Sequence, residues 1–317
     1  MLILLKIIPL FLVMAVGFAG ARRGFFPPGF VGPANRLAYF LAIPALILRA
    51  VAHAPLAESL RPLPTLLAVA ALLLGWGLAL LAAQRLPFAK ESPKPYKASW
   101  VQCSIHGNQG LMGLAVVFYA LGQPGLASAG LIATGIIITQ NLLSVITLTR
   151  WGDRRQDGGE NAQGAGEVSY FKTLALNPII LVTVLGLALA LAEIRLPDFL
   201  DRTLEILAGL GMPLALLIVG ARLSETRMGG AWTGLMVMQT LKLMAIPALG
   251  MLLLWICGVE ALPMAVAVVL LSSPTATLTV IMADQMGGDA PLSSQAISAS
   301  HALSVLSYSF WLWLLIP

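Results

Sequence analysis

A short polar stretch interrupts one of the long hydrophobic segments of this chain. Within residues 100–122 (WVQCSIHGNQGLMGLAVVFYALG) it brings together a hydroxyl, an imidazole, two side-chain amides and three glycines. These residues are Ser104, His106, Asn108, Gln109, Gly107, Gly110 and Gly113. Side-chain amides can donate hydrogen bonds to a carboxylate, and glycines let the backbone depart from a regular helix. The stretch therefore predicts a binding site for a small anion at a break in a helix.

A second polar stretch, residues 270–279 (LLSSPTATLT), has the same character. Pro274 lacks a backbone donor and clashes with the preceding turn, so it is expected to end a half-helix. The hydroxyls of Ser273, Thr275 and Thr277 are further donors for a carboxylate. The N-termini of broken helices also favour an anion. We expect no arginine near the middle of the membrane, so uncharged donors would bind the anion loosely enough to release it.

The composition predicts that both stretches lie in a membrane. The chain has 317 residues, of which 58% are hydrophobic and 10% are charged, with a mean hydropathy of +0.88. Soluble domains are roughly 25% charged. The net charge of +5 is assigned to short loops and not to a nucleic-acid partner. The two cysteines lack metal-ligand spacing, and we expect neither a metal nor another cofactor.

Hydropathy predicts ten membrane-spanning helices, because each apolar run has the length of about 20 residues that a bilayer requires. The runs cover residues 3–20, 35–53, 63–84, 98–121, 126–149, 173–192, 203–222, 232–257, 263–286 and 293–316. With the N-terminus outside, thirteen Lys and Arg residues fall on the cytoplasmic side and four on the outer side. Positive charge favours the cytoplasm, so both termini are predicted to be extracytoplasmic. Residues 150–171 would form a cytoplasmic linker.

The two halves of the chain, residues 1–149 and 172–317, resemble each other. Pro9 and Pro44 are thirty-five residues apart, and so are Pro178 and Pro213, within similar apolar sequences. Five spans per half make the second copy enter the membrane in the opposite sense, which is the inverted repeat of many secondary transporters. The alternative is chance similarity between apolar helices. Interrupted segments at corresponding places, here the fourth and ninth spans, are typical of a binding site at the membrane midplane.

These motifs resemble the auxin efflux carrier family, which includes plant auxin exporters and bacterial transporters of malate and malonate type. The resemblance rests on residues 108–115 (NQGLMGLA), residues 214–223 (LALLIVGARL), Pro274, Ala283, Lys242 and Pro247. It implies the ten-helix fold of bile acid sodium symporters. Helices one, two, six and seven would form a scaffold that dimerises, and helices three to five and eight to ten a moving core. The fourth and ninth helices would cross, with Asn108 contacting the substrate carboxylate.

The chain departs from the plant members in two respects. The family prolines at the crossing correspond to Ala115 and Thr279, so the breaks are expected to depend on Gly107, Gly110, Gly113 and Pro274. The long cytoplasmic loop of the plant hormone exporters is also missing, so auxin is not the expected substrate.

Several residues are candidates for coupling or support. His106 could couple a proton to transport, or it could be a hydrogen-bonded core histidine. Lys242 could balance the charge of the substrate, contact a carbonyl at a break, or extend to the membrane surface. His301 and the pair Gln140 and Asn141 are candidates for supporting the site.

The sequence therefore predicts an all-α polytopic membrane protein that acts as a secondary transporter of a small organic anion, a carboxylate. We expect a homodimer in a bacterial inner membrane that works by an elevator-like motion. No Asp or Glu lies in the middle of a span, which favours coupling to membrane potential or protons. A sodium-coupled symporter of bile acid type is the alternative. An intramembrane enzyme using His106 or His301 is disfavoured, because HExxH, GxSxG and paired carboxylates are missing.

Overall fold

The computed structural model describes residues 2–27, 29–53, 62–152, 178–225 and 232–316 of the chain. The regular elements of these residues are helices, accompanied by one isolated antiparallel bridge. Within the same residues, five stretches are long and apolar enough to cross a membrane, namely Val31–Arg49, Pro62–Arg85, Gln109–Trp151, Asp198–Arg222 and Trp232–Ile256. This helical, apolar architecture is that of a polytopic membrane protein.

The helices follow the predicted apolar ranges. They are α1 (Leu2–Arg22), α2 (Val31–Leu37), η1 (Ala38–Ala42), α3 (Ile43–Ala52), α5 (Pro62–Arg85), α6 (Pro87–Lys90), α7 (Lys94–Ile105), η2 (Gln109–Gly113), α8 (Leu114–Trp151), α10 (Pro178–Leu191), α11 (Asp198–Glu225), α12 (Trp232–Thr240), η3 (Leu241–Ala245), α13 (Ile246–Ile256), α14 (Ala261–Leu271), α15 (Leu278–Gln285) and α16 (Ala290–Leu315). The elements η1 to η3 are single π-helical turns. The ten membrane spans and their inverted repeat stay predictions. Residues 153–177, which include most of the predicted linker and the start of the predicted sixth span, lie outside the described residues.

A kink at Gly122 divides α8 into the end of the predicted fourth span and the whole fifth. The backbone there has φ 70° and ψ −164°, a conformation that favours glycine because it has no Cβ. The non-helical residue separates the helix that follows η2 from a second helix with a different direction. Residues of the fifth span can therefore pack against the break that precedes η2.

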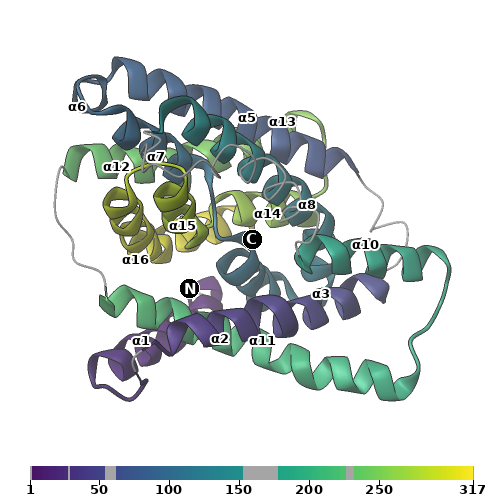
Figure 1. Cartoon of the computed structure of the whole chain (residues 1–317). Coiled ribbons are helices and arrows are strands. Elements are labelled where there is room, and N and C mark those ends of the chain that lie inside the picture. The colour runs from purple at the N-terminus through teal and green to yellow at the C-terminus, as the bar shows by residue number, and fades with distance from the viewer. Residues whose placement is uncertain (1, 28, 54–61, 153–177, 226–231, 317) are drawn as a thin grey trace, which may run out of the picture.

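The helices gather into two groups in Figure 1. The purple helices α1, α2 and α3 lie with the green helix α11 along the lower side of the view, and α5, α7 and α12 to α16 lie above them. Extensive contacts join α1 to α11 and α10 to α3. Helices α1, α2, α3, α10 and α11 lie in the first, second, sixth and seventh predicted spans. The family resemblance assigns these four spans to the scaffold. The division into a scaffold and a moving core stays a prediction.

Glycines allow α1 and α11 to pack with their backbones in contact. A Cβ placed on Gly220 would overlap the backbone carbonyl of Met14, and one placed on Gly17 would overlap that of Leu217. Small residues at such positions are typical of close helix pairs in membranes. The two helices therefore cannot keep this separation if either glycine gains a side chain.

We expect Gly220→Ala to destabilise the protein and Gly209→Ala to leave it as stable or more stable. Gly209 lies on the same helix, and a Cβ added there would meet nothing within 4 Å, while alanine is the better helix former by about 1 kcal/mol. Overpacking at Gly220 costs about 1–3 kcal/mol. The measurement is the thermal midpoint of both variants in detergent. Equal midpoints for the two variants would show that the α1–α11 contact can relax.

Candidate functional site

Both polar stretches interrupt helices in the structure. Residues 106–108 separate α7 from η2, and residues 272–277 separate α14 from α15. His106 ends α7 with an extended backbone (φ −86°, ψ 96°), and Asn108 precedes η2 with φ −90° and ψ 64°. The breaks therefore occur in the segments that contain the predicted polar residues and Pro274.

The two breaks lie against each other and pair through their backbones, a contact that we call the crossing. The Asn108 N–H donates to the Pro274 carbonyl at 2.7 Å, and the Ala276 N–H donates to the His106 carbonyl at 3.0 Å. Gly107 and Thr275 form the antiparallel bridge at the centre of this pairing. The crossing thus satisfies backbone groups that the breaks would leave unpaired in an apolar medium.

Gly107 and Thr275, at the centre of the pairing, lie eight and four residues before the positions that correspond to the family prolines. Ala115 is the second residue of α8 and Thr279 is the second residue of α15, and both are buried. Gly110 and Gly113 lie in η2. A Cβ on Gly113 would be 2.6 Å from the Ser273 hydroxyl, so this glycine lets η2 approach the end of α14.

Each break caps the C-terminal end of the other interrupted helix. The Thr275 hydroxyl donates to the Cys103 carbonyl of α7 at 3.2 Å. In the opposite direction, the Gln109 amide donates to the Leu270 carbonyl of α14 at 3.4 Å. The last carbonyls of a helix lack intrahelical partners and carry partial negative charge. Thr275 and Gln109, which the sequence predicts as substrate contacts, are therefore used within the fold.

Lys242 caps α14 as well. Its ammonium donates to the Leu271 carbonyl at 3.0 Å, and the residue is only 1% exposed. A Cβ on Gly107 would lie 2.7 Å from the Lys242 nitrogen, so the ammonium lies against the crossing itself. Of the three roles considered for Lys242, the structure supports contact with a carbonyl at the break.

The fifth predicted span supports the crossing through Gln140. Its amide oxygen accepts from the Gly107 N–H at 2.9 Å, and its amide nitrogen donates to the Gly107 carbonyl at 3.0 Å and to Gln109 at 2.8 Å. His106 Nδ1 lies 2.8 Å from the hydroxyl of Ser144, one helical turn beyond Gln140. Asn141 instead donates to the Ile137 carbonyl of its own helix at 2.8 Å. Sequence reasoning missed Ser144. Its position one helical turn after Gln140, in an otherwise apolar helix, is the signal that could have indicated it.

The tenth predicted span contributes two partners that sequence reasoning missed. The Ser300 hydroxyl accepts from the Thr275 N–H at 2.9 Å. The Tyr308 hydroxyl donates to the Ser273 hydroxyl at 3.2 Å, and Ser273 donates to the Val269 carbonyl at 3.4 Å. Ser273, like Thr275 and Gln109, is therefore engaged within the protein.

Asn108 retains an unused donor. Its side-chain oxygen accepts from the Leu111 N–H at 3.3 Å and so caps η2. Its amide nitrogen is buried and has no hydrogen-bond partner within the described residues, and Asn108 as a whole is 6% exposed. An unpaired buried N–H next to a helix N-terminus can donate to an anion.

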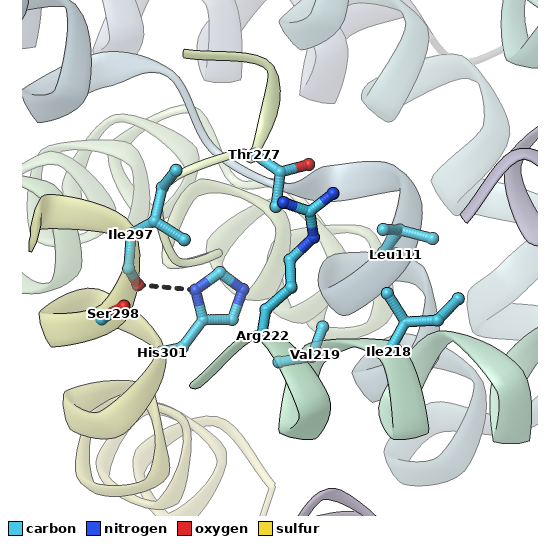
Figure 2. A pocket seen from close by; sticks show the side chains of 8 residues that line it. All are labelled: Leu111, Ile218, Val219, Arg222, Thr277, Ile297, Ser298 and His301. Carbon is cyan, nitrogen blue, oxygen red and sulfur yellow. Dashed lines mark hydrogen bonds between the residues drawn. The ribbon is translucent and has the colours of Figure 1, made fainter. Parts of the chain in front are cut away.

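A small pocket opens beside the crossing, between the two groups of helices. It is lined by Leu111, Ile218, Val219, Arg222, Thr277, Ile297, Ser298 and His301. Figure 2 shows the Arg222 side chain extending from α11 between His301 and Leu111 toward Thr277. The expectation that no arginine lies near the middle of the membrane stays a prediction. Arg222 lies within α11, because that helix continues to Glu225.

His301 is buried in the same pocket. Its Nδ1 donates to the Ile297 carbonyl of its own helix at 2.7 Å. Its Nε2 has no hydrogen-bond partner within the described part of the chain, and the residue is 2% exposed. The pocket therefore brings together Arg222, His301 and Thr277, of which the sequence had indicated only the last two.

Known proteins similar to this chain are transporters. The profile of a family described as membrane transport protein matches residues 2–312. A protein of Rhizobium meliloti described as "Putative malonate transporter" is 26% identical over 316 residues, which cover 98% of this chain and 94% of that protein. A transporter of Methanocaldococcus jannaschii described as uncharacterized is 24% identical over 217 residues, 67% of each chain. The family and these relatives agree with the prediction that the chain is not an enzyme.

Proposed function

Because the chain belongs to the membrane transport protein family, which the resemblance to auxin efflux carriers anticipated, we propose that it is a secondary transporter of a small carboxylate. The observation that supports this substrate class is the buried Asn108 amide, which has no hydrogen-bond partner within the described residues. It lies at the N-terminal end of η2, where peptide dipoles favour negative charge. The other predicted donors at the crossing, Gln109, Ser273 and Thr275, position the break and leave Asn108 to contact the substrate.

The proposed movement is elevator-like. The crossed segments α7–η2 and α14–α15 would carry the substrate as one core, and α1, α2, α3, α10 and α11 would form a stationary, dimeric scaffold. Reciprocal capping supports the first part of this proposal, since hydrogen bonds join the two crossed segments directly. The apolar residues Leu12, Val184 and Ile206 are exposed on α1, α10 and α11, as lipid or dimer contacts require.

We propose a bacterial inner membrane location with ten spans, an inverted repeat and both termini outside the cytoplasm. Membrane potential or protons would drive transport. Potential alone supplies about 2.3 kcal/mol per charge per 100 mV. Uptake that requires sodium would instead support the alternative, a symporter of bile acid type.

Purified protein in proteoliposomes is expected to take up radiolabelled malonate, the first substrate to test because of the relative from Rhizobium meliloti. Uptake should exceed that of empty liposomes, compete with other short carboxylates and persist without sodium. A thermal-shift screen of monocarboxylates and dicarboxylates extends the test beyond malonate. If no carboxylate is transported or raises the thermal midpoint, the proposed substrate class is wrong.

A further inference from the structure

We propose that the ammonium of Lys242 occupies the place of a coupled cation, so that the protein carries this charge permanently and moves its substrate without sodium. The proposal rests on the proposed transport of a small carboxylate and deepens it by naming the residue that determines its ion coupling. It starts from the position of Lys242 between the interrupted helices, where the side-chain nitrogen contacts the end of α14.

The C-terminal end of α14 is a place where a cation is stabilised. The last carbonyls of a helix lack intrahelical partners and carry partial negative charge. In secondary transporters such half-helix ends, together with unwound backbone carbonyls, coordinate sodium or protons. Here the Leu271 carbonyl accepts from the Lys242 ammonium at 3.0 Å. A Cβ on Gly107 would lie 2.7 Å from the same nitrogen and 3.2 Å from the unwound Ser273 carbonyl oxygen, so a second carbonyl of the break lies in the neighbourhood of the ammonium.

No carboxylate of the described residues neutralises this ammonium. Lys242 is 1% exposed, and the ion pairs of these residues do not include it. Burial of a charge is costly unless an opposite charge or dipole compensates it. The other donor to this end of α14, the Gln109 amide, is uncharged and bonds to the Leu270 carbonyl at 3.4 Å. The end of α14 therefore holds one full positive charge, which is the charge of one sodium ion.

The distorted turn that contains Lys242 is supported by α16. Lys242 lies in the π-helical turn η3, and π-helical turns are frequent at functional sites. Pro247 has no N–H to donate to the Leu243 carbonyl four residues earlier. Two side chains of α16 supply donors instead, the Ser307 hydroxyl at 3.0 Å and the Trp311 indole N–H at 2.8 Å. The packing of α16 thus holds the turn and, with it, the position of Lys242 at the crossing.

The corresponding end of α7 shows that a cap alone does not require a charge. Its Cys103 carbonyl accepts from the Thr275 hydroxyl at 3.2 Å. Both residues are fully buried, as Lys242 nearly is. An uncharged donor is therefore sufficient to cap an interrupted helix in this fold. The full charge at the end of α14 indicates a role besides capping, and replacement of a coupled cation is such a role.

The test compares Lys242→Ala with Lys242→Met. Alanine removes the ammonium and leaves room for a cation, whereas methionine fills most of that room. Thermal midpoints of purified protein are measured in sodium chloride and in choline chloride at the same ionic strength. We expect sodium to raise the midpoint of Lys242→Ala by at least about 2 °C, since a ligand that binds the folded state stabilises it. The midpoints of wild-type protein and of Lys242→Met should be the same in both salts.

Uptake of radiolabelled malonate into proteoliposomes gives the second readout. Wild-type protein should transport equally well with sodium or choline outside. Lys242→Ala should transport at least about tenfold faster with sodium than with choline, because sodium binding is then coupled to transport. Lys242→Arg retains a positive charge and should stay insensitive to sodium. A variant that lacks only a structural cap would lose transport in both salts.

The proposal is overturned if the midpoint of Lys242→Ala is the same in both salts, if its transport is lost in both, or if wild-type transport requires sodium. Should Lys242→Ala not fold, Lys242→Gln decides, since its amide keeps a donor for the Leu271 carbonyl and adds an oxygen that can ligate a cation. Sodium should raise its midpoint, and equal midpoints in both salts would contradict the proposal. The midpoints need no substrate, so they still test Lys242 if the wild-type protein transports no carboxylate and the proposed function itself fails.

Discussion

Asn108→Ala is expected to reduce malonate transport roughly 10- to 100-fold, the cost of losing a buried hydrogen bond to an anionic group. The variant removes the amide nitrogen that has no hydrogen-bond partner within the described residues. It also removes the oxygen that caps η2 through Leu111. A loss of transport could therefore arise from a lost substrate contact or from a weakened break.

Asn108→Asp separates the two causes. The carboxylate keeps an acceptor for the Leu111 N–H, and Asp is a favoured residue at a helix N-cap. It replaces the donor by a negative charge that repels an anionic substrate. We expect transport to be lost although the cap of η2 is kept, and we expect burial of the new carboxylate to lower the thermal midpoint. Wild-type transport by Asn108→Asp would mean that the Asn108 amide does not contact the substrate.

Lys242→Met is the second substitution with a large expected effect. Methionine keeps much of the volume of lysine but cannot donate to the Leu271 carbonyl at the end of α14. A buried carbonyl without its partner costs about 1–3 kcal/mol, and the negative end of the helix dipole loses a cation. We expect a lower thermal midpoint together with reduced transport, because the ammonium lies against Gly107 at the crossing.

Lys97→Met is the matched control. Lys97 also donates to a backbone carbonyl, that of Lys90 at 2.7 Å, but this hydrogen bond is exposed to water. Water can replace the lost donor there, so we expect little change in the thermal midpoint. If the two variants are equally stable and active, Lys242 does not hold the break in place.

The positions of the breaks could be predicted from sequence because the physical constraint is local. Polar side chains, glycines and Pro274 within apolar segments leave few alternatives to an interrupted helix surrounded by protein. The hydrogen-bond partners could not be predicted in the same way. Gln109 bonds to Leu270 and Thr275 bonds to Cys103, pairs that are 161 and 172 residues apart. Only the packing of the whole chain decides whether such a donor faces the protein or the substrate.

Arg222 shows a second limit of sequence reasoning. A positive charge at the end of an apolar run is typical of a cytoplasmic loop, and the hydropathy of residues 203–222 ends there. The helix nevertheless continues to Glu225. The side chain then extends away from α11 into the pocket beside His301. Hydropathy reports the apolar length of a span, not the direction of the charged side chain at its end.

The hydrogen bonds by which each break caps the other interrupted helix also affect folding during synthesis. The Cys103 carbonyl is bonded by a hydroxyl that follows 172 residues later in the chain. At synthesis rates of about 5–20 residues per second, the ribosome needs roughly 10 to 30 s to supply it. During this interval the Cys103 carbonyl near the C-terminal end of α7 lacks this hydrogen-bond donor. The first half of the protein is therefore expected to need lipid headgroups, water or an insertion chaperone as a temporary partner until the second half arrives.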